Sequence, residues 1–151
     1  YLIIHRAGNG ICGDYFPTLD FATEQITKCI DITDPRNGMW DTVRIGLSCP
    51  LIKTKKGWLM LYHGISWSGV YRVGALLLDL KDPTIVLSRT AAPFFEPDAE
   101  YESQGVVSNV VFPCGVVERK GLLYIYYGAA DKYIGAATIP LKTVLSYLEN
   151  K

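Results

Sequence analysis

One phrase of the sequence occurs twice at a long interval, and this repetition restricts the possible folds more than any other feature. The first copy, Gly57 to Gly64 (GWLMLYHG), aligns position by position with the second copy, Gly121 to Gly128 (GLLYIYYG). Each copy follows a turn containing Lys and Gly. The run from Trp58 to Tyr62 is solidly apolar, which is typical of a strand buried on both faces. His63 then marks the point where this strand is expected to leave the core, and binding sites are often built there.

The chain also opens on a version of this phrase. Tyr1 to Arg6 (YLIIHR) aligns with Trp58 to His63, so Arg6, His63 and Tyr127 occupy equivalent positions. A self-similar β unit of roughly 60 residues is typical of a repeat architecture, and a four-stranded propeller blade has a suitable length. We therefore predict an all-β fold, a partial β-propeller of about two and a half blades. Since propellers close with about four to eight blades, the chain is expected to be part of a longer protein.

Composition supports a globular β domain and excludes several functional classes. The chain has 151 residues, 49% hydrophobic content and 10 Tyr, enough for a core and favourable to strands. Lys plus Arg and Asp plus Glu both number 15, so no net charge favours nucleic acid or a membrane surface. No apolar segment of about 18 residues is present, so no membrane span is expected.

The four cysteines, Cys12, Cys29, Cys49 and Cys114, are scattered and form no CxxC pair. With only 2 His in the chain, a structural zinc site is not expected, and no metal or cofactor is predicted. Their apolar neighbours favour free thiols in a reducing, cytoplasmic environment, with disulfides as the alternative.

Turn residues and apolar runs predict the order of the elements. A strand over Tyr1–Arg6 is followed by a loop over Ala7–Thr18 and by an outward strand over Ile26–Ile32. Further strands and one helix are predicted at the following ranges: a hairpin of Cys49–Thr54 with Gly57–His63, strands over Tyr71–Leu80, Thr84–Arg89 and Val106–Phe112, a hairpin over Val116–Tyr127, a strand over Tyr133–Ile139, and a short C-terminal helix after Pro140.

Polar residues near the predicted strand ends are the candidate site. Besides Arg6, His63 and Tyr127, they include Arg44, Tyr71 and Asp131. Two guanidiniums and a phenol suit an oxyanion such as phosphate, because a guanidinium makes bidentate hydrogen bonds. The carboxylate and the imidazole suit sugar hydroxyls. Each residue also has a simpler interpretation: an arginine or aspartate in a surface ion pair, or a buried histidine with satisfied hydrogen bonds.

The sequence resembles the C-terminal half of glycoside hydrolase family 130, the β-mannoside phosphorylases. The phrases that carry the resemblance run in family order over essentially the whole chain: Tyr1 to Arg6; Trp40-Asp41 with Arg44-Ile45-Gly46; Gly57-Trp58-Leu59 with Tyr62-His63-Gly64; Tyr71 with Gly74 to Asp79; Asp82-Pro83; Tyr101-Glu102 with Gly105; Asn109 to Phe112; and Tyr126 to Asp131.

This resemblance implies a five-bladed propeller whose single catalytic domain has residues 1–151 as its C-terminal portion. It also implies inverting phosphorolysis of β-mannosides to mannose 1-phosphate. Arg6 and Tyr71 match family phosphate-binding positions, and Arg44 stands where the family usually has lysine. Asp131 matches an aspartate expected to hold mannosyl hydroxyls, and His63 is expected to line the same pocket. The segment Gly46 to Pro50 departs from the family phrase, which puts the sugar site in question.

No catalytic residue is expected within this segment, because the family's general acid, an aspartate, belongs to the N-terminal blades. The segment alone is therefore expected to be inactive. Oligosaccharide and inorganic phosphate are the expected partners, a homo-oligomer is possible, and neither nucleic acid nor membrane is expected. A β-mannoside hydrolase of the same family and a non-catalytic carbohydrate-binding propeller are the alternatives. Phosphate dependence of turnover distinguishes the first alternative, and an acid opposite Arg6 distinguishes the second.

Overall fold

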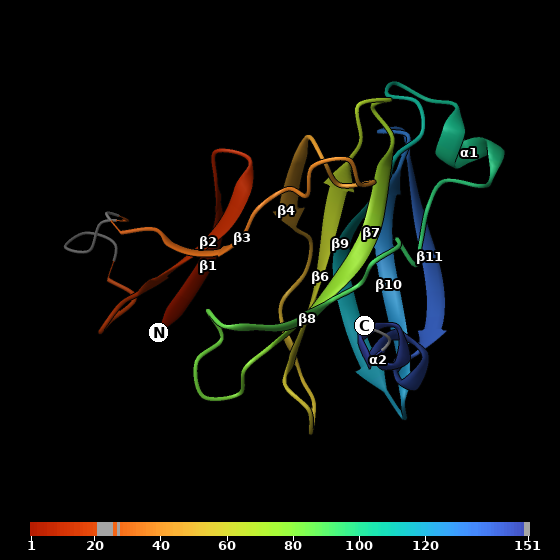
Figure 1. Ribbon diagram of the computed structural model, residues 1–151. Helices are drawn as coiled ribbons and strands as arrows, with labels where there is room; N and C mark the ends of the chain where they lie inside the picture. Colours follow the sequence, from red (N-terminus) through yellow and green to blue (C-terminus); the bar gives the residue numbers. More distant parts are fainter. Residues whose placement is uncertain (21–25, 27, 150–151) are drawn as a thin grey trace.

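The computed structural model describes residues 1–20, 26 and 28–149. This part of the chain forms eleven β-strands and two helices. The strands make three separate antiparallel sheets that lie side by side (Figure 1). The all-β prediction is therefore confirmed for the described residues.

The first sheet is a meander of three strands in the order β1-β2-β3. Its strands are β1 (Leu2–Ala7), β2 (Gly10–Tyr15) and β3 (Ile30–Thr33). The predicted loop over Ala7–Thr18 is wrong over Gly10–Tyr15, which forms β2. Gly13 is a strand residue: a Cβ there would come within 3.0 Å of Leu2 Cδ1, so the glycine allows close packing.

The strand predicted over Ile26–Ile32 begins only at Ile30, and residue 27 of that range lies outside the described residues. Cys12 of β2 and Cys29, just before β3, form a disulfide. The expectation of free thiols is wrong for these two cysteines, because the β2–β3 pairing brings them together across a sequence separation of 17 residues. Cys49 and Cys114 are free, the former buried and the latter exposed.

The second sheet is central and has the strand order β4-β6-β7-β8, with β5 also pairing with β6. Its strands are β4 (Arg44–Leu47), β5 (Ile52–Lys53), β6 (Trp58–Ile65), β7 (Tyr71–Leu78) and β8 (Val86–Arg89). The predicted hairpin of residues 49–63 is confirmed. β6 continues two residues beyond His63, to Ile65, so His63 lies inside the strand and not at its end.

The third sheet has the order β11-β10-β9. Its strands are β9 (Val111–Arg119), β10 (Leu122–Ala129) and β11 (Tyr133–Pro140). The β9–β10 hairpin is confirmed, but the strand predicted over Val106–Phe112 starts only at Val111. Asn109 has a φ of 59°, a left-handed conformation that interrupts extended backbone. The loop before β9 contains a short helix that sequence analysis missed, α1 (Glu100–Ser103).

The strands of the repeated phrase occupy equivalent places. β1, β6 and β10 each pair antiparallel with the strand that follows in the sheet, β2, β7 and β11 respectively. Arg6, His63 and Tyr127 therefore have cross-strand partners at matching points of their hairpins: Ile11, Val73 and Gly135. None of the three described sheets closes on itself, and the number of blades remains a prediction.

The central sheet is buried on both faces, as the apolar run from Trp58 predicts. Leu59 and Leu61 belong to a core shared with the third sheet, whereas Met60 and Tyr62 belong to a core shared with the first sheet. All four side chains are at most 1% exposed. Because successive side chains of a strand point to opposite faces, one strand joins both cores. Complete burial of one such side chain contributes about 2 kcal/mol.

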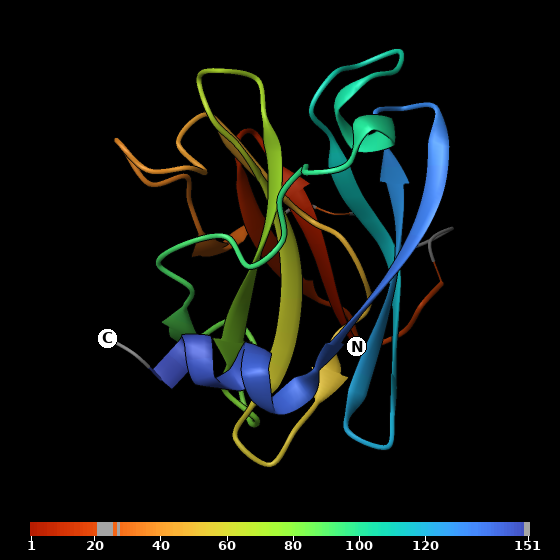
Figure 2. The same cartoon turned by 90° about the vertical axis from the view of Figure 1, so that its right-hand side faces the viewer.

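The predicted C-terminal helix is confirmed as α2 (Leu141–Glu149). Figure 2 shows it lying across the lower ends of the strands of the central sheet. Its buried residues Val144 and Leu148 complete the core between the second and third sheets. Lys56 forms an ion pair with Glu149 at the end of the helix. No helix in the described ranges is long and apolar enough to cross a bilayer.

Candidate functional site

Four of the predicted site residues line one pocket between the first, second and third sheets. Arg6 comes from β1, Arg44 from β4, His63 from β6 and Tyr71 from the start of β7. The pocket has a volume of about 460 Å³. Its full lining is Ile4, His5, Arg6, Arg44, Gly46, Leu47, His63, Tyr71 and Phe112. Arg6 and His63, two of the three equivalent positions of the repeat, thus line the same pocket although they are far apart in the sequence.

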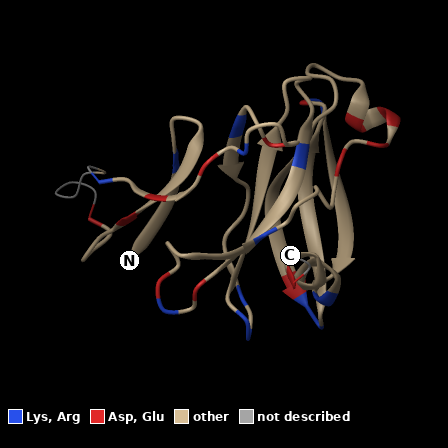
Figure 3. Cartoon of the chain, viewed as in Figure 1, with Lys and Arg blue, Asp and Glu red and all other residues tan. Residues whose placement is uncertain are grey.

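The pocket is positively charged. Arg6 and Arg44 have no carboxylate partner within the described residues, whereas Arg36, Arg72 and Arg89 are all in ion pairs. Over the whole chain, basic and acidic residues are interspersed (Figure 3). Two unpaired guanidiniums in one hollow without a lining carboxylate therefore form a local feature suited to an anion.

Arg44 is held so that part of its hydrogen-bonding capacity stays unused. Its Nη2 donates to Tyr71 Oη at 3.5 Å. Its Nε is buried and has no hydrogen-bond partner among the described residues. A buried, unsatisfied donor costs about 1–3 kcal/mol, more on a charged group. An anion bound beside Arg44 would remove this cost and use the fork of the guanidinium.

His63 is neutral at physiological pH. Burial, together with the smaller effect of the positive charges of Arg6 and Arg44, lowers the pKa of His63 to about 4. Its ring lies 4.4 Å from the ring of Phe112, centroid to centroid, and 6.1 Å from that of Tyr71. Nδ1 is 3.4 Å from Ser48 Oγ. A neutral imidazole offers one donor and one acceptor, which suits a hydroxyl or a phosphate oxygen.

Backbone contacts between the sheets fix the strands that carry these residues. Ile45 N donates to Asn9 O at 2.9 Å, which ties β4 to the β1–β2 turn beside Arg6. Tyr71 N donates to Asn109 O at 3.0 Å, which ties β7 to the chain before β9. The pocket therefore has walls from all three sheets that are joined by direct hydrogen bonds.

Tyr127, the third equivalent of the repeat, lies outside this pocket and has a structural role. Its hydroxyl donates to Glu102 Oε1 at 2.6 Å and is 3.0 Å from Tyr101 Oη. Burial and the bond to Glu102 raise the pKa of Tyr127 well above its usual value. Burial raises the pKa of Glu102, but hydrogen bonds from Asp98 N, Tyr127 and Ala99 N outweigh it and the net shift is downward. This buried contact anchors α1 on β10.

Asp131 is not among the residues that line the pocket. It is exposed in the β10–β11 turn, with a φ of 51°. Its predicted contact with mannosyl hydroxyls therefore remains a prediction, and it is separate from the cluster of Arg6, Arg44, His63 and Tyr71.

Asp41 is the centre of a second polar cluster, which shares no residue with the pocket lining. Its carboxylate is fully buried and accepts hydrogen bonds from Arg36 Nη2 at 2.8 Å, Arg89 Nη2 at 2.6 Å and Tyr62 Oη at 2.8 Å. Trp40 stacks on Tyr62 beside it, with ring centroids 5.5 Å apart. These contacts fix the segment that leads into β4 and so help to place Arg44.

Sequence reasoning did not select His5, Gly46, Ser48 or Phe112, which line the pocket or contact its residues. Period-two alternation would place His5 and Arg6 on opposite faces, yet both line the pocket. His5 Nε2 is 2.7 Å from the buried carboxylate of Asp14. Gly46 and Ser48 lie in the segment from Gly46 to Pro50 that departs from the family phrase, and His5 and Phe112 lie in phrases that carry the resemblance, so these phrases were the available signal.

The comparison with known proteins now decides the family. A family model described as beta-1,4-mannooligosaccharide phosphorylase matches residues 18–150. The chain belongs to glycoside hydrolase family 130. The members of this family include glycoside phosphorylases, so the chain is part of an enzyme family, as the resemblance implied.

Relatives in family 130 agree in sequence and structure. A beta-1,2-mannobiose phosphorylase from Thermoanaerobacter sp. (strain X514) is 47% identical over 110 residues, 73% of this chain and 36% of the relative. The solved beta-1,2-mannobiose phosphorylase from Listeria innocua, in complex with beta-1,2-mannobiose, is 43% identical with a TM-score of 0.79; the match covers 80% of this chain and 34% of that chain. The chain thus spans about a third of the length of these relatives.

A third solved structure bears the description "The GH130 family of mannoside phosphorylases contains glycoside hydrolases that target beta-1,2 mannosidic linkages in Candida mannan". It is 30% identical to this chain with a TM-score of 0.72, and the match covers 89% of this chain and 41% of that chain. Phosphorolysis and hydrolysis are therefore both found among proteins that share this fold.

Proposed function

We propose that the intact protein containing this chain catalyses inverting phosphorolysis of β-mannosides and releases mannose 1-phosphate. Inorganic phosphate would be held by Arg6, Arg44 and Tyr71, and the mannosyl unit would contact His63 and Asp131. The observation that carries this proposal is the buried Arg44 Nε without a partner, beside a second unpaired guanidinium and a phenol.

The pocket suits phosphate as a nucleophile. Charge-assisted hydrogen bonds from two guanidiniums favour a dianion over water, because the negative charge of the anion is attracted more strongly than the dipole of neutral water. Neutral His63 can add a hydrogen bond to phosphate, and it binds the anion less strongly than a third cation would. The same pocket would place a phosphate oxygen next to the sugar, and positioning of two reactants lowers the barrier to a bimolecular step.

The remaining machinery would come from parts of the protein outside this chain. We propose that the three sheets are consecutive blades of a five-bladed propeller, and that the general acid, a carboxylic acid, faces the pocket from another blade. This chain alone would then be inactive. The protein is proposed to act in the cytoplasm on oligosaccharides, with phosphate as co-substrate and without a metal or organic cofactor.

The substrate class is a manno-oligosaccharide, with the β-1,2 linkage as the first choice. Both relatives at more than 40% identity described above are named for beta-1,2-mannobiose. The family model is described by the β-1,4 linkage, so β-1,4-mannobiose is the necessary comparison.

The test is product formation by the intact protein from each disaccharide with and without inorganic phosphate. We expect each disaccharide that is cleaved to give one mannose 1-phosphate and one free mannose. The rate should be proportional to the phosphate concentration when that concentration is low. Equal turnover without phosphate, with both sugar units released as free mannose, would overturn phosphorolysis and support the hydrolase. The hydrolase is the second candidate because a solved neighbour comes from a study of such enzymes.

Variants connect this activity to the pocket. Arg44→Ala removes a charged partner of phosphate, worth about 1.5–3 kcal/mol, so KM for phosphate should rise about 10- to 100-fold while KM for the disaccharide changes little. Arg6→Ala should act in the same direction. Arg119→Ala is the matched control, since Arg119 is exposed at the far end of β9. An unchanged KM for phosphate in both pocket variants would contradict the assignment.

A further inference from the structure

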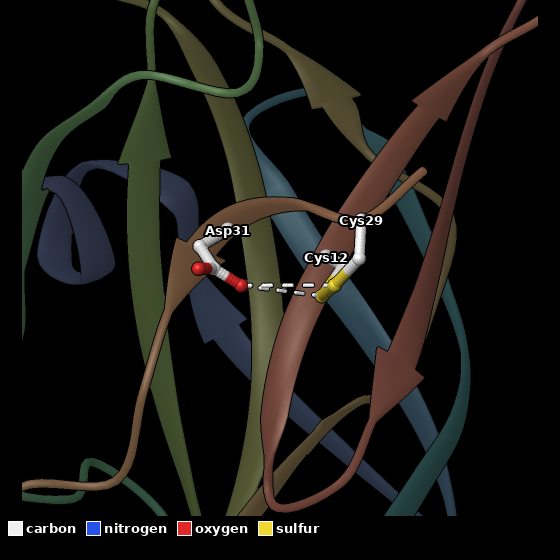
Figure 4. A group of neighbouring side chains, drawn as sticks. All are labelled: Cys12, Cys29 and Asp31. Carbon is white, nitrogen blue, oxygen red and sulfur yellow. Dashed lines mark hydrogen bonds between the residues drawn. A yellow bond between two sulfur atoms is a disulfide. The ribbon is translucent and has the colours of Figure 1, made fainter. Parts of the chain in front are cut away.

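The first sheet brings together three side chains that the candidate site does not use: Cys12, Cys29 and Asp31 (Figure 4). Cys12 and Asp31 are direct cross-strand partners in the β2–β3 register. Cys29 precedes Asp31 by two residues, and residues two apart along extended chain share a face. The hairpin thus gathers two sulfurs and a carboxylate, although nothing in their sequence spacing indicates a ligand set.

The three ligand atoms are close to one another. Both sulfurs lie 3.6 Å from Asp31 Oδ1. All the possible ligand atoms are within 4.8 Å of each other. Around a tetrahedral zinc ion, with Zn–S near 2.3 Å and Zn–O near 2.0–2.2 Å, ligand atoms are separated by about 3.5–4 Å. Small side-chain rotations would therefore convert this group into a metal-binding geometry once the sulfur–sulfur bond is opened.

This juxtaposition does not depend on the disulfide alone. The β2–β3 pairing holds Cys12 opposite Asp31. Lys28 N donates to Asp14 Oδ1 at 2.9 Å, which ties the residue before Cys29 to β2. Because hydrogen bonds hold the chain on both sides of Cys29, we expect the three residues to stay together after reduction.

We propose that Cys12, Cys29 and Asp31 form a redox-gated site for a thiophilic divalent cation, for which Zn²⁺ is the chemical model. In the reduced form, two thiolates and one carboxylate bind the cation. In the oxidised form the sulfurs are bonded to each other and cannot act as thiolate ligands. The oxidation consumes a small-molecule disulfide: the two protein thiols form one disulfide, and the reagent receives the two electrons and two protons and leaves as two thiols.

The ligand set selects the class of cation. Thiolates favour Zn²⁺ over Mg²⁺ and Ca²⁺, which prefer oxygen ligands. Cys29 and Asp31 are exposed and Cys12 is buried, so the ion would reach the site from solvent and leave a fourth position to water. The thiols must lose their protons to bind the cation, so the affinity of the site for the cation should rise with pH.

The test uses the intact protein after reduction by a phosphine, with Co²⁺ as a spectroscopic probe for the zinc position. We expect a thiolate-to-cobalt charge-transfer absorption that Zn²⁺ abolishes, and loss of this absorption after prior oxidation with glutathione disulfide. Cys29→Ser and Asp31→Asn should each weaken Co²⁺ binding at least about tenfold. Both positions are exposed, so these variants should keep the fold, which the thermal unfolding midpoint checks.

Cys114→Ser is the matched control, because Cys114 is an exposed free thiol outside the cluster and should leave the spectrum unchanged. Absence of a charge-transfer band in the reduced protein would overturn the proposal. So would a band of equal strength in folded Cys29→Ser. Neither result bears on phosphorolysis, because the cluster shares no residue with the phosphate pocket.

Discussion

Gly46 and His63 face each other directly across the β4–β6 ladder, and the histidine ring packs against the Cα of the glycine. A Cβ on Gly46 would lie 2.6 Å from His63 Cε1 and 2.8 Å from Nε2. The ring fills the space that a side chain at residue 46 would need. This relationship turns the imidazole toward Phe112 and Tyr71 and sets one wall of the pocket.

Gly46→Ala should therefore displace the ring of His63 from the pocket. Both residues lie in paired strands, so the ring and not the backbone has to move. Overpacking of this kind costs about 1–3 kcal/mol of stability, and the KM for phosphate should rise together with the loss of stability. Thermal unfolding and phosphate kinetics of the intact variant check both effects. Gly115→Ala is the control, because nothing lies within 4 Å of the Cβ position at residue 115. Gly8→Ala is unsuitable, because Gly8 has a φ of 58° and alanine would be strained there.

The low pKa of His63 predicts a loss of stability in mild acid. Burial, together with Arg6 and Arg44, holds the folded pKa at about 4, below the usual 6.5. As the pH falls from 6.5 to 4, His63 becomes protonated in the unfolded chain but stays neutral in the folded chain. The free energy of unfolding therefore decreases. The decrease should reach about 2 kcal/mol at pH 5 and about 3 kcal/mol below pH 4.

Urea unfolding of the intact protein and of His63→Gln at pH 7.5 and pH 5 isolates this contribution. The wild type should lose about 2 kcal/mol more than the variant on going to pH 5. Parallel losses in both proteins would show that His63 is protonated in the folded state and would contradict a neutral ring in the pocket.

The buried Asp41 cluster should be a major determinant of stability. Asp41→Asn removes the charge that pairs with Arg36 and Arg89, which leaves two guanidiniums partly buried without compensation. We expect a loss of about 3–5 kcal/mol. Tyr62→Phe removes one neutral donor from the same carboxylate and should cost about 1 kcal/mol. Glu100→Gln, an exposed site, is the control, and equal effects of all three substitutions would refute this ranking.

The two free cysteines should differ in reactivity. Burial raises the pKa of Cys49 to about 12, with a smaller contribution from nearby Cys114, whereas Cys114 is exposed. Because the thiolate is the nucleophile, iodoacetamide at pH 8 should label Cys114 at least about 100-fold faster than Cys49. Peptide mass spectrometry of the native protein measures both rates. Rapid labelling of Cys49 without unfolding would show that this part of the second sheet is open.

The local sequence pattern predicted the structure correctly where the residues of a single strand or helix determine it. The solid apolar run at Trp58–Tyr62 predicted a strand buried on both faces, and the repeated phrase predicted that Arg6 and His63 lie near each other in space. Helical spacing after Pro140 was sufficient for α2. In each case, the period of the side chains carries the information.

Sequence reasoning was wrong where a contact between distant segments determines the outcome. Gly10 and Gly13 favour a loop by composition, but they lie in β2, where neighbouring segments of the chain approach closely. The Cys12–Cys29 bond depends on the β2–β3 register, and the Val106–Phe112 prediction missed the left-handed Asn109. Tyr127 matched His63 in sequence, yet α1 covers it, so equivalent positions of a repeat need not share a function.

A crystal structure of the intact protein with inorganic phosphate would show whether the pocket of Arg6, Arg44, His63 and Tyr71 binds this anion. We predict one phosphate in this pocket, with oxygens within about 2.7–3.1 Å of guanidinium nitrogens of both arginines and of Tyr71 Oη. Arg44 Nε should then have a partner. A pocket that stays without phosphate at saturating concentration, or phosphate bound only elsewhere, would contradict the account.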